Sequence, residues 1–320
     1  MSEQVDTRQL ILDSAQKIFS DHCDKKLLDQ AETGQFPDTL WQVVRENGFD
    51  QLGSYATGTD WNDLFAFVQT CGRFAVPLPM TETLLANQWA GAGGLSSIGE
   101  IIDGQIVSVP WGRSVSRVVG IEADTREVVV VESPQVVHQG SNMAGEPNDI
   151  IAIPDNAQKI EVPQDPYALS ALGRINLMAG CLQTVLDLGI QFATERTQFG
   201  RSISKFQAIQ HSLAVVAAEV AAALRAADAA VDAVSSDRFL DEVAASKARV
   251  GEAVGVVAEQ VHQIHGAMGF THEHQLHHYT RRAWAWRDEW GNEFYWQARL
   301  GMALAQLGAD NVWDFIATRG

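Results

Sequence analysis

The chain has 320 residues and nine prolines, yet none of these prolines occurs after Pro166. Proline breaks helices because it lacks a backbone donor and clashes with the preceding turn. In this half, apolar residues recur every three or four positions, as one helix face requires. One series is Ile209, Leu213, Val216, Val220, Leu224, Ala227 and Val231. The other is Val243, Val250, Val254, Val257, Val261, Ile264 and Met268, with Lys247 interrupting one step. Long helices joined by short turns, as at residues 235–237, predict an antiparallel four-helix bundle.

The residues before this bundle follow two other patterns. Residues 1–97 show helical spacing, broken near Pro77 and Pro79. Residues 98–165 hold short β-branched runs, such as 106–109 and 128–131, separated by Gly, Pro, Asp and Ser. We therefore predict an α+β fold with an N-terminal helical domain (1–97), a small middle β domain (98–165) and a C-terminal helical bundle (166–320).

The formal charge of −17, from 40 acidic and 23 basic residues, argues against nucleic acid or an anionic membrane as the main partner. Cys23, Cys71 and Cys181 are far apart and form no C-x-x-C motif, so a disulfide framework or zinc knuckle is not indicated. The acidic residues 1–6 do not resemble a signal peptide, and no run of about 18 apolar residues occurs. We expect a cytoplasmic protein that does not span a membrane.

Two motifs in the predicted bundle carry the functional information. The run Arg-Thr-Gln-Phe-Gly begins at Arg196 and is followed by Gln207, and the segment Gln-Ile-His-Gly-Ala-Met-Gly-Phe-Thr covers residues 263–271. Either motif alone is a weak pattern, but the pair in this order and separation, on predicted helices, is specific. Together they resemble the flavin-holding signatures of the acyl-CoA dehydrogenase family, whose domain order is similar to the one predicted here.

The resemblance implies that FAD lies between the β domain and the bundle of one subunit, and that the bundle of a neighbouring subunit reaches its diphosphate and adenine. Arg196 matches the arginine that meets the diphosphate, for which a guanidinium is well suited. Ala267 stands where the family usually has a second glycine. The remaining cofactor contacts implied by the resemblance are Gln198, Phe199, Gln207, Gln263, Gly266 and Gly269. The alternative interpretation is ordinary helix packing.

The family's reaction removes a proton next to the thioester carbonyl and passes a hydride to the flavin, so it needs a carboxylate base. The two positions at which the family places this base correspond to Trp290 and Ser170, and neither is a carboxylate. Glu289 is the best candidate for the base, with Asp288 and Glu293 as weaker candidates. The alternative for Glu289 is a solvated or salt-bridged carboxylate.

The β domain also lacks the family's Thr-Glu…Gly-Ser-Asp segment, for which residues 109–112 are a candidate remnant. The absence of this segment and of the base indicates that the chain is one half of a heteromeric enzyme. It would be similar to the α2β2 bacterial dehydrogenases that act on steroid side-chain CoA thioesters. Expected partners are an acyl-CoA substrate, a homo- or hetero-oligomer that includes a second dehydrogenase-like subunit, and an electron-transfer flavoprotein. The alternatives are a non-catalytic partner subunit and, from another class, a helical interaction or metal-binding protein.

Two side-chain clusters leave further alternatives open. Residues 272–278 contain four histidines without an H-E-x-x-H motif, so we predict no metal site there and favour second-shell or interface histidines. Trp284, Trp286, Trp290 and Trp296 could line a pocket for a bulky acyl group, anchor a subunit interface or belong to the core.

Overall fold

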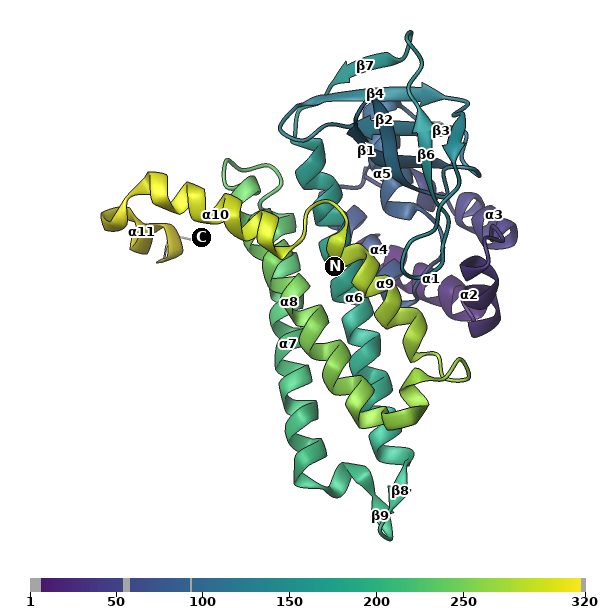
Figure 1. The fold of residues 1–320 in the computed structure, drawn as a ribbon, viewed down its shortest axis with the longest axis vertical. Coiled ribbons are helices and arrows are strands. Elements are labelled where there is room, and N and C mark those ends of the chain that lie inside the picture. The colour runs from purple at the N-terminus through teal and green to yellow at the C-terminus, as the bar shows by residue number, and fades with distance from the viewer. Residues whose placement is uncertain (1–6, 54–57, 93, 318–320) are drawn as a thin grey trace, which may run out of the picture.

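The structure, a computed structural model, describes residues 7–53, 58–92 and 94–317. A layer of helices and a β-sheet lie at one end of a long helical bundle (Figure 1). The α+β architecture predicted from the sequence is confirmed. The acidic residues 1–6 lie outside the described part of the chain.

In the described ranges before residue 96, five helices and a short 3₁₀ turn precede the sheet. They are α1 (Thr7–His22), α2 (Lys25–Glu32), α3 (Asp38–Glu46), η1 (Phe49–Gln51), α4 (Trp61–Arg73) and α5 (Met80–Ala90). Local capping explains where two of them begin. The Asp24 carboxylate accepts a hydrogen bond from the backbone N–H of Leu27, and Asp60 and Asp63 form a capping box at the start of α4.

Among the described residues the sheet has seven strands in the order β5-β6-β2-β1-β3-β4-β7, of which the β1–β3 pair is parallel and the other pairs are antiparallel. The strands are β1 (Ser96–Ile102), β2 (Gln105–Pro110), β3 (Arg117–Ile121), β4 (Glu127–Glu132), β5 (Val136–His138), β6 (Asn148–Ala152) and β7 (Gln158–Glu161). In β4, Val128 and Val130 join the main core, whereas Val129 and Val131 join a second core on the other face. The period-two alternation of a strand thus connects the sheet to two apolar layers.

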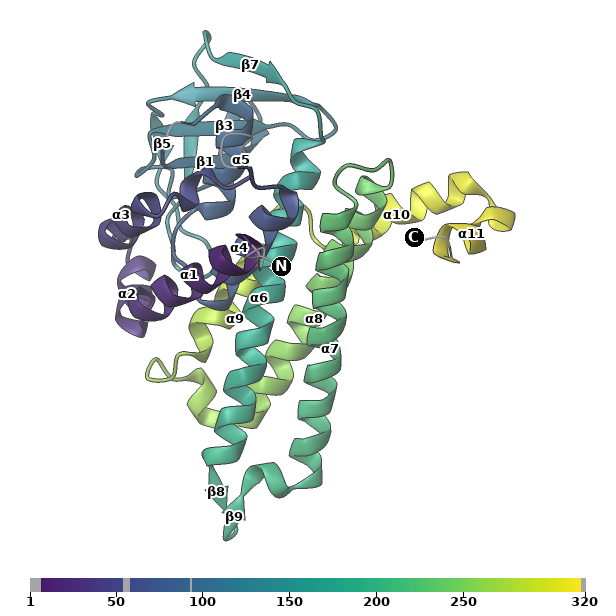
Figure 2. The same cartoon turned by 180° about the vertical axis from the view of Figure 1, so that it is seen from behind.

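The bundle consists of four helices, followed by a C-terminal arm that projects from the body in both views (Figures 1 and 2). Its elements are α6 (Pro166–Glu195), β8 (Thr197–Gln198), β9 (Arg201–Ser202), η2 (Ile203–Lys205), α7 (Gln207–Asp232), α8 (Phe239–His265), η3 (Gly266–Phe270) and α9 (Leu276–Asp288). The arm comprises α10 (Glu293–Leu307), η4 (Ala309–Asn311) and α11 (Val312–Ala317). Asp165 caps α6 and Pro166 occupies its first turn, where a missing N–H costs nothing.

Helix α6 is the central helix of the molecule. Within the described ranges it is the one helix whose length and composition would allow it to cross a membrane, and 56% of that apolar window is buried inside the protein. It packs against α4, α7, α8 and α9. Its apolar character therefore has a direct explanation as the core of the bundle.

Paired glycines allow α4 and α6 to approach closely. A methyl group added at Gly180 of α6 would overlap the carbonyl oxygen of Gln69, and one added at Gly72 of α4 would overlap the carbonyl oxygen of Leu177. Each overlap involves backbone, which cannot rotate away. This crossing fixes the N-terminal helices on the bundle.

We predict that Gly180→Ala lowers the free energy of unfolding by about 1–3 kcal/mol, because overpacking at a rigid contact forces the backbone apart. Urea denaturation followed by circular dichroism measures the change. Gly301→Ala is the matched control, since Gly301 is helical and has open space around its Cα. The control should be neutral or stabilising by up to about 1 kcal/mol. Equal midpoints for Gly180→Ala and the wild-type chain would contradict the close-contact interpretation.

Candidate functional site

The first motif forms the turn between α6 and α7 at the base of the bundle. Arg196 ends α6, and the chain then makes a two-stranded hairpin, β8–β9. Its two central residues, Phe199 and Gly200, both have positive φ, 53° and 79°, as a tight two-residue hairpin loop requires. The Phe199 side chain is 91% exposed. The motif thus presents a guanidinium and an aromatic ring on a protruding turn.

The second motif ends α8 beside this hairpin. Gly266 caps the helix with a φ of 57°, and η3 follows. Gly269 has a packing role, because a methyl group there would lie 3.0 Å from both the His262 Nδ1 atom and the His265 Cβ atom. Ala267, by contrast, is exposed, so its methyl group causes no internal clash.

The two motifs face each other across one cleft of about 500 Å³. The predicted cofactor residues that line this cleft are Arg196, Gln198, Phe199, Gln263, Gly266 and Ala267. Gly269 lines the neighbouring groove, and Gln207 is exposed at the first turn of α7. Motifs that are about 60 residues apart in the sequence are therefore joined in a single concave surface, which is the usual form of a ligand site.

Arg196 is available to a ligand in this cleft. Its backbone bonds to Phe192 and Ile203, whereas its guanidinium has no hydrogen-bond or ion-pair partner among residues 7–53, 58–92 and 94–317. In a chain of formal charge −17, an unpaired guanidinium beside exposed glycine backbone is suited to a diphosphate. The residues present at the cleft thus fit the diphosphate end of FAD.

The second region of interest is the junction where α5, the end of β2, α6 and the turn after α9 meet. Its centre is Arg174, which pairs with Glu82 through Nη2 and with Glu289 through Nε, the latter at 2.5 Å. The side chains of Arg174, Glu82 and Glu289 are 3%, 4% and 14% exposed. We call these three residues the junction triplet.

The junction triplet leaves little space. The cavity at the junction measures about 40 Å³, and its other walls include Pro79, Trp111, Leu177 and Trp286. Such a volume accommodates about one water molecule, whose share of the liquid is roughly 30 Å³. A flavin ring does not fit in this junction as the chain is folded here.

The ionisation of the triplet follows from its burial. Burial raises the pKa of Glu289, and the neighbouring Arg174 opposes that rise. Burial also works to lower the pKa of Arg174, but Glu289 and Glu82 outweigh it and hold that pKa above its usual range. Arg174 therefore remains a cation that binds the Glu289 carboxylate.

Lys247 holds the turn that contains Glu289. Its Nζ donates to the carbonyl oxygens of Arg287 and Gly291, at 2.7 Å each, and its burial lowers its pKa to about 7. Trp290, with a positive φ of 56°, accepts a hydrogen bond at its carbonyl oxygen from Trp296 Nε1 at 2.9 Å. The turn is thus held in place by buried donors on both sides.

The residues at the family's two base positions have structural contacts here. Trp290 packs edge-on against Tyr167, with ring centroids 5.4 Å apart, and the Ser170 hydroxyl donates to the Pro166 carbonyl at 2.9 Å. The two weaker candidates for the base differ from Glu289 in their surroundings. Asp288 is exposed, whereas Glu293 is buried and pairs with Arg287. Glu289 is therefore the carboxylate of this group that reaches the junction.

The sequence interpretation missed Glu82 and Arg174. A usable signal was present for Arg174, since it is the one charge between Pro166 and Leu186 in an otherwise apolar helix. A charge in such a position is almost never buried without a partner. No comparable signal marks Glu82, because it lies 92 residues from Arg174.

The clusters of tryptophan and histidine have separate locations. Trp286, Trp290 and Trp296 are buried, while Trp284 stacks on Arg287 and lines a wide groove of about 1280 Å³ between α8 and α9. His274 lies before α9, whereas His277 and His278 lie in its first turn. The wide groove is larger than the cleft of about 500 Å³ between the two motifs.

Comparison with known proteins agrees with this arrangement. The family description "Acyl-CoA dehydrogenase, C-terminal domain" matches residues 168–291. Acyl-CoA dehydrogenase IpdE2 of Mycolicibacterium smegmatis is 24% identical over 305 residues, covering 88% of this chain and 93% of the relative. The ChsE4-ChsE5 complex of Mycobacterium tuberculosis is similar with a TM-score of 0.84 at 18% identity, covering 97% of this chain and all of the matched chain. The Tcur3481-Tcur3483 steroid acyl-CoA dehydrogenase has a TM-score of 0.83 at 18% identity, covering 93% and 98%.

Residues 168–291 thus form an acyl-CoA dehydrogenase C-terminal domain, and the chain as a whole is similar in sequence and fold to acyl-CoA dehydrogenases, which are FAD-binding oxidoreductases acting on CH–CH bonds.

We predict that Arg174→Gln lowers the free energy of unfolding by about 3–5 kcal/mol at pH 8, because two carboxylates remain buried without a cation. Without the guanidinium, the pKa of Glu289 rises further above its unfolded value of about 4.3, so the folded state binds more protons than the unfolded state. The destabilisation should therefore shrink as the pH falls from 8 to 5. Urea unfolding at three pH values measures it.

Arg225→Gln is the control for this prediction, since the Arg225–Asp228 pair is exposed and contributes about 0–1 kcal/mol. A destabilisation by Arg174→Gln that is the same at pH 5 and pH 8 would contradict the assigned ionisation of the triplet.

Proposed function

We propose that the chain is one subunit of a heteromeric, FAD-dependent acyl-CoA dehydrogenase that introduces the α,β double bond into an acyl-CoA thioester. In this proposal its bundle binds the diphosphate and adenosine end of an FAD whose flavin ring lies in a second, unlike subunit. The contrast between an open cleft at Arg196 and a closed junction at Arg174 carries the proposal.

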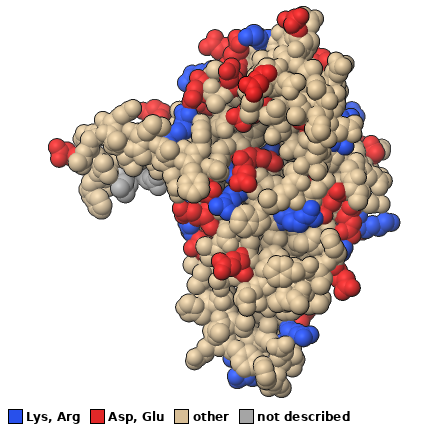
Figure 3. Space-filling view, in the orientation of Figure 1, with Lys and Arg blue, Asp and Glu red and all other residues tan. Residues whose placement is uncertain are grey.

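The surface supports a subunit contact near this cleft. In Figure 3, charged side chains gather over the upper part of the molecule, while the lower part of the bundle is mostly uncharged. The wide groove between α8 and α9 adjoins the cleft, since Gln263 lines both. The groove is lined by both charged side chains, such as Arg249 and Glu252, and apolar ones, as subunit interfaces commonly are.

The substrate we propose is a bulky acyl-CoA, of which a steroid side-chain thioester is the specific case. Support comes from the similar Tcur3481-Tcur3483 protein, which is described as a steroid acyl-CoA dehydrogenase. The similar ChsE4-ChsE5 structure is a complex of two proteins, which supports a heteromer here. An electron-transfer flavoprotein as electron acceptor and a cytoplasmic location remain predictions.

Two roles for Glu289 follow from the sequence, catalytic base or structural carboxylate. A base must be free to approach the substrate proton within about 3 Å. Glu289 instead binds the buried Arg174 guanidinium beside a cavity of about 40 Å³. These contacts favour the structural role, in which this chain is the non-catalytic partner of the pair.

We predict that the chain purified alone is colourless, and that co-expression with the partner subunit gives a yellow complex. Arg196→Gln should weaken FAD binding by the complex by about 10–100-fold, because one charge-assisted contact to phosphate contributes roughly 1.5–3 kcal/mol. Flavin absorbance after gel filtration measures occupancy. Lys205→Gln removes a nearby exposed cation that does not line the cleft, so it serves as control. Flavin bound by the chain alone would contradict the shared site.

We predict that Glu289→Gln in the reconstituted complex leaves kcat within roughly threefold of wild type, since a residue outside the chemical step contributes little to it. Steady-state turnover with an artificial electron acceptor measures this. A loss of about 10²–10⁴-fold, as expected on removal of a general base, would establish Glu289 as the base instead.

A further inference from the structure

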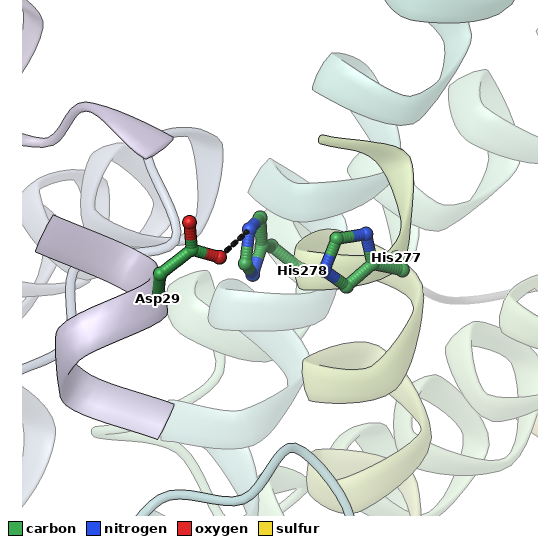
Figure 4. Close-up of side chains that lie close together, drawn as sticks. All are labelled: Asp29, His277 and His278. Atoms are coloured by element: carbon green, nitrogen blue, oxygen red, sulfur yellow. Dashed lines mark ion pairs between the residues drawn. The ribbon is translucent and has the colours of Figure 1, made fainter. Parts of the chain in front are cut away.

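Three side chains from two distant segments meet where α2 packs against the start of α9. Asp29 projects from α2 toward His278, and His277 lies beside it in the first turn of α9 (Figure 4). One ligand-type atom of each residue lies within 4.8 Å of the other two. Asp29 Oδ1 is 3.2 Å from His278 Nε2.

Neighbouring acceptors orient both imidazole rings. His278 Nδ1 lies 2.7 Å from Glu32 Oε1, and His277 Nδ1 lies 2.7 Å from the His274 carbonyl oxygen. A carbonyl or an ionised carboxylate can only accept, so each Nδ1 carries the proton. In the neutral form, each ring then has its lone pair on Nε2. Metal-bound histidines show this same arrangement, with the second nitrogen donating to a carboxylate or a carbonyl.

Both Nε2 atoms lack a hydrogen-bond partner among the described residues, although His278 is fully buried and His277 is 9% exposed. The 3.2 Å approach of Asp29 to His278 has the distance of an ion pair but not the geometry of a hydrogen bond. Buried polar atoms are nearly always paired, so two adjacent bare nitrogens require an explanation.

The site is open to solvent on the side of α2. The Asp29 side chain is 47% exposed, which leaves a route for an ion from solvent.

Contrary to the expectation from the sequence, which predicted no metal site at residues 272–278, we propose that Asp29, His277 and His278 bind a divalent first-row metal ion, with Zn²⁺ as the best match to two imidazole nitrogens and one carboxylate. Tetrahedral Zn²⁺ with ligands at about 2.0–2.1 Å places them roughly 3.3 Å apart, and the three ligand atoms here already lie within 4.8 Å of one another. Water supplies the fourth ligand. The ion would link α2 to α9 and so fasten the N-terminal helices to the bundle.

The test uses the untagged full-length chain after treatment with EDTA and dialysis. Zn²⁺ is titrated in competition with the chromophoric chelator 4-(2-pyridylazo)resorcinol, and thermal unfolding is recorded with and without Zn²⁺. We expect one Zn²⁺ per chain and a rise in Tm on binding. Asp29→Asn and His277→Asn should each weaken Zn²⁺ binding at least tenfold and abolish the Zn²⁺-dependent rise in Tm.

Asp29→Asn is the principal variant because the Asp29 side chain is largely exposed, so the folded state should persist in EDTA. His211→Asn, which replaces an exposed histidine on α7, is the control for nonspecific histidine binding. Visible bands of the Co²⁺-substituted chain provide a second readout of ligand number. Failure of the wild-type chain to bind stoichiometric Zn²⁺, or equal Zn²⁺ affinity in wild type, Asp29→Asn and His277→Asn, would overturn the proposal.

Discussion

The salt bridges of Arg174 with Glu82 and Glu289 determine where the molecule has space for a ligand. They join α5, α6 and the turn after α9, three segments that are far apart in the sequence. A buried cation between two carboxylates is costly to desolvate and costly to break. Because the triplet occupies the junction, the space that remains there is about 40 Å³, against about 500 Å³ at the base of the bundle.

The open cleft and the closed junction limit how two subunits could share one FAD. If FAD spans two subunits, each cofactor needs an open cleft from one chain and an open junction from the other. A homodimer of this chain would offer two open clefts and two closed junctions, so the flavin rings would have no place. A partner with an open junction removes the conflict, so the geometry supports the proposed heteromer independently of the similarity to known complexes.

Local and periodic features allowed most of the fold to be predicted. The proline-free half with regular apolar spacing predicted the bundle, and residues of the two glycine-bearing motifs now line one cleft. The junction could not be predicted in the same way. Glu82 and Glu289 lie 92 and 115 residues from Arg174, and each residue alone resembles an ordinary surface charge. Long-range polar pairing has no periodic signal in a single sequence.

The placement of the cations explains the division of roles proposed for the two regions. At the junction, Arg174 is fully engaged by carboxylates of its own chain, and Lys247 is engaged by two backbone carbonyls. A carboxylate that must accept a proton is weakened as a base by a guanidinium bound to it, since that contact stabilises the ionised form. At the cleft, the guanidinium of Arg196 has no hydrogen-bond or ion-pair partner among the described residues, so it can bind an anion. The same residue type thus closes one region and equips the other for a phosphate ligand.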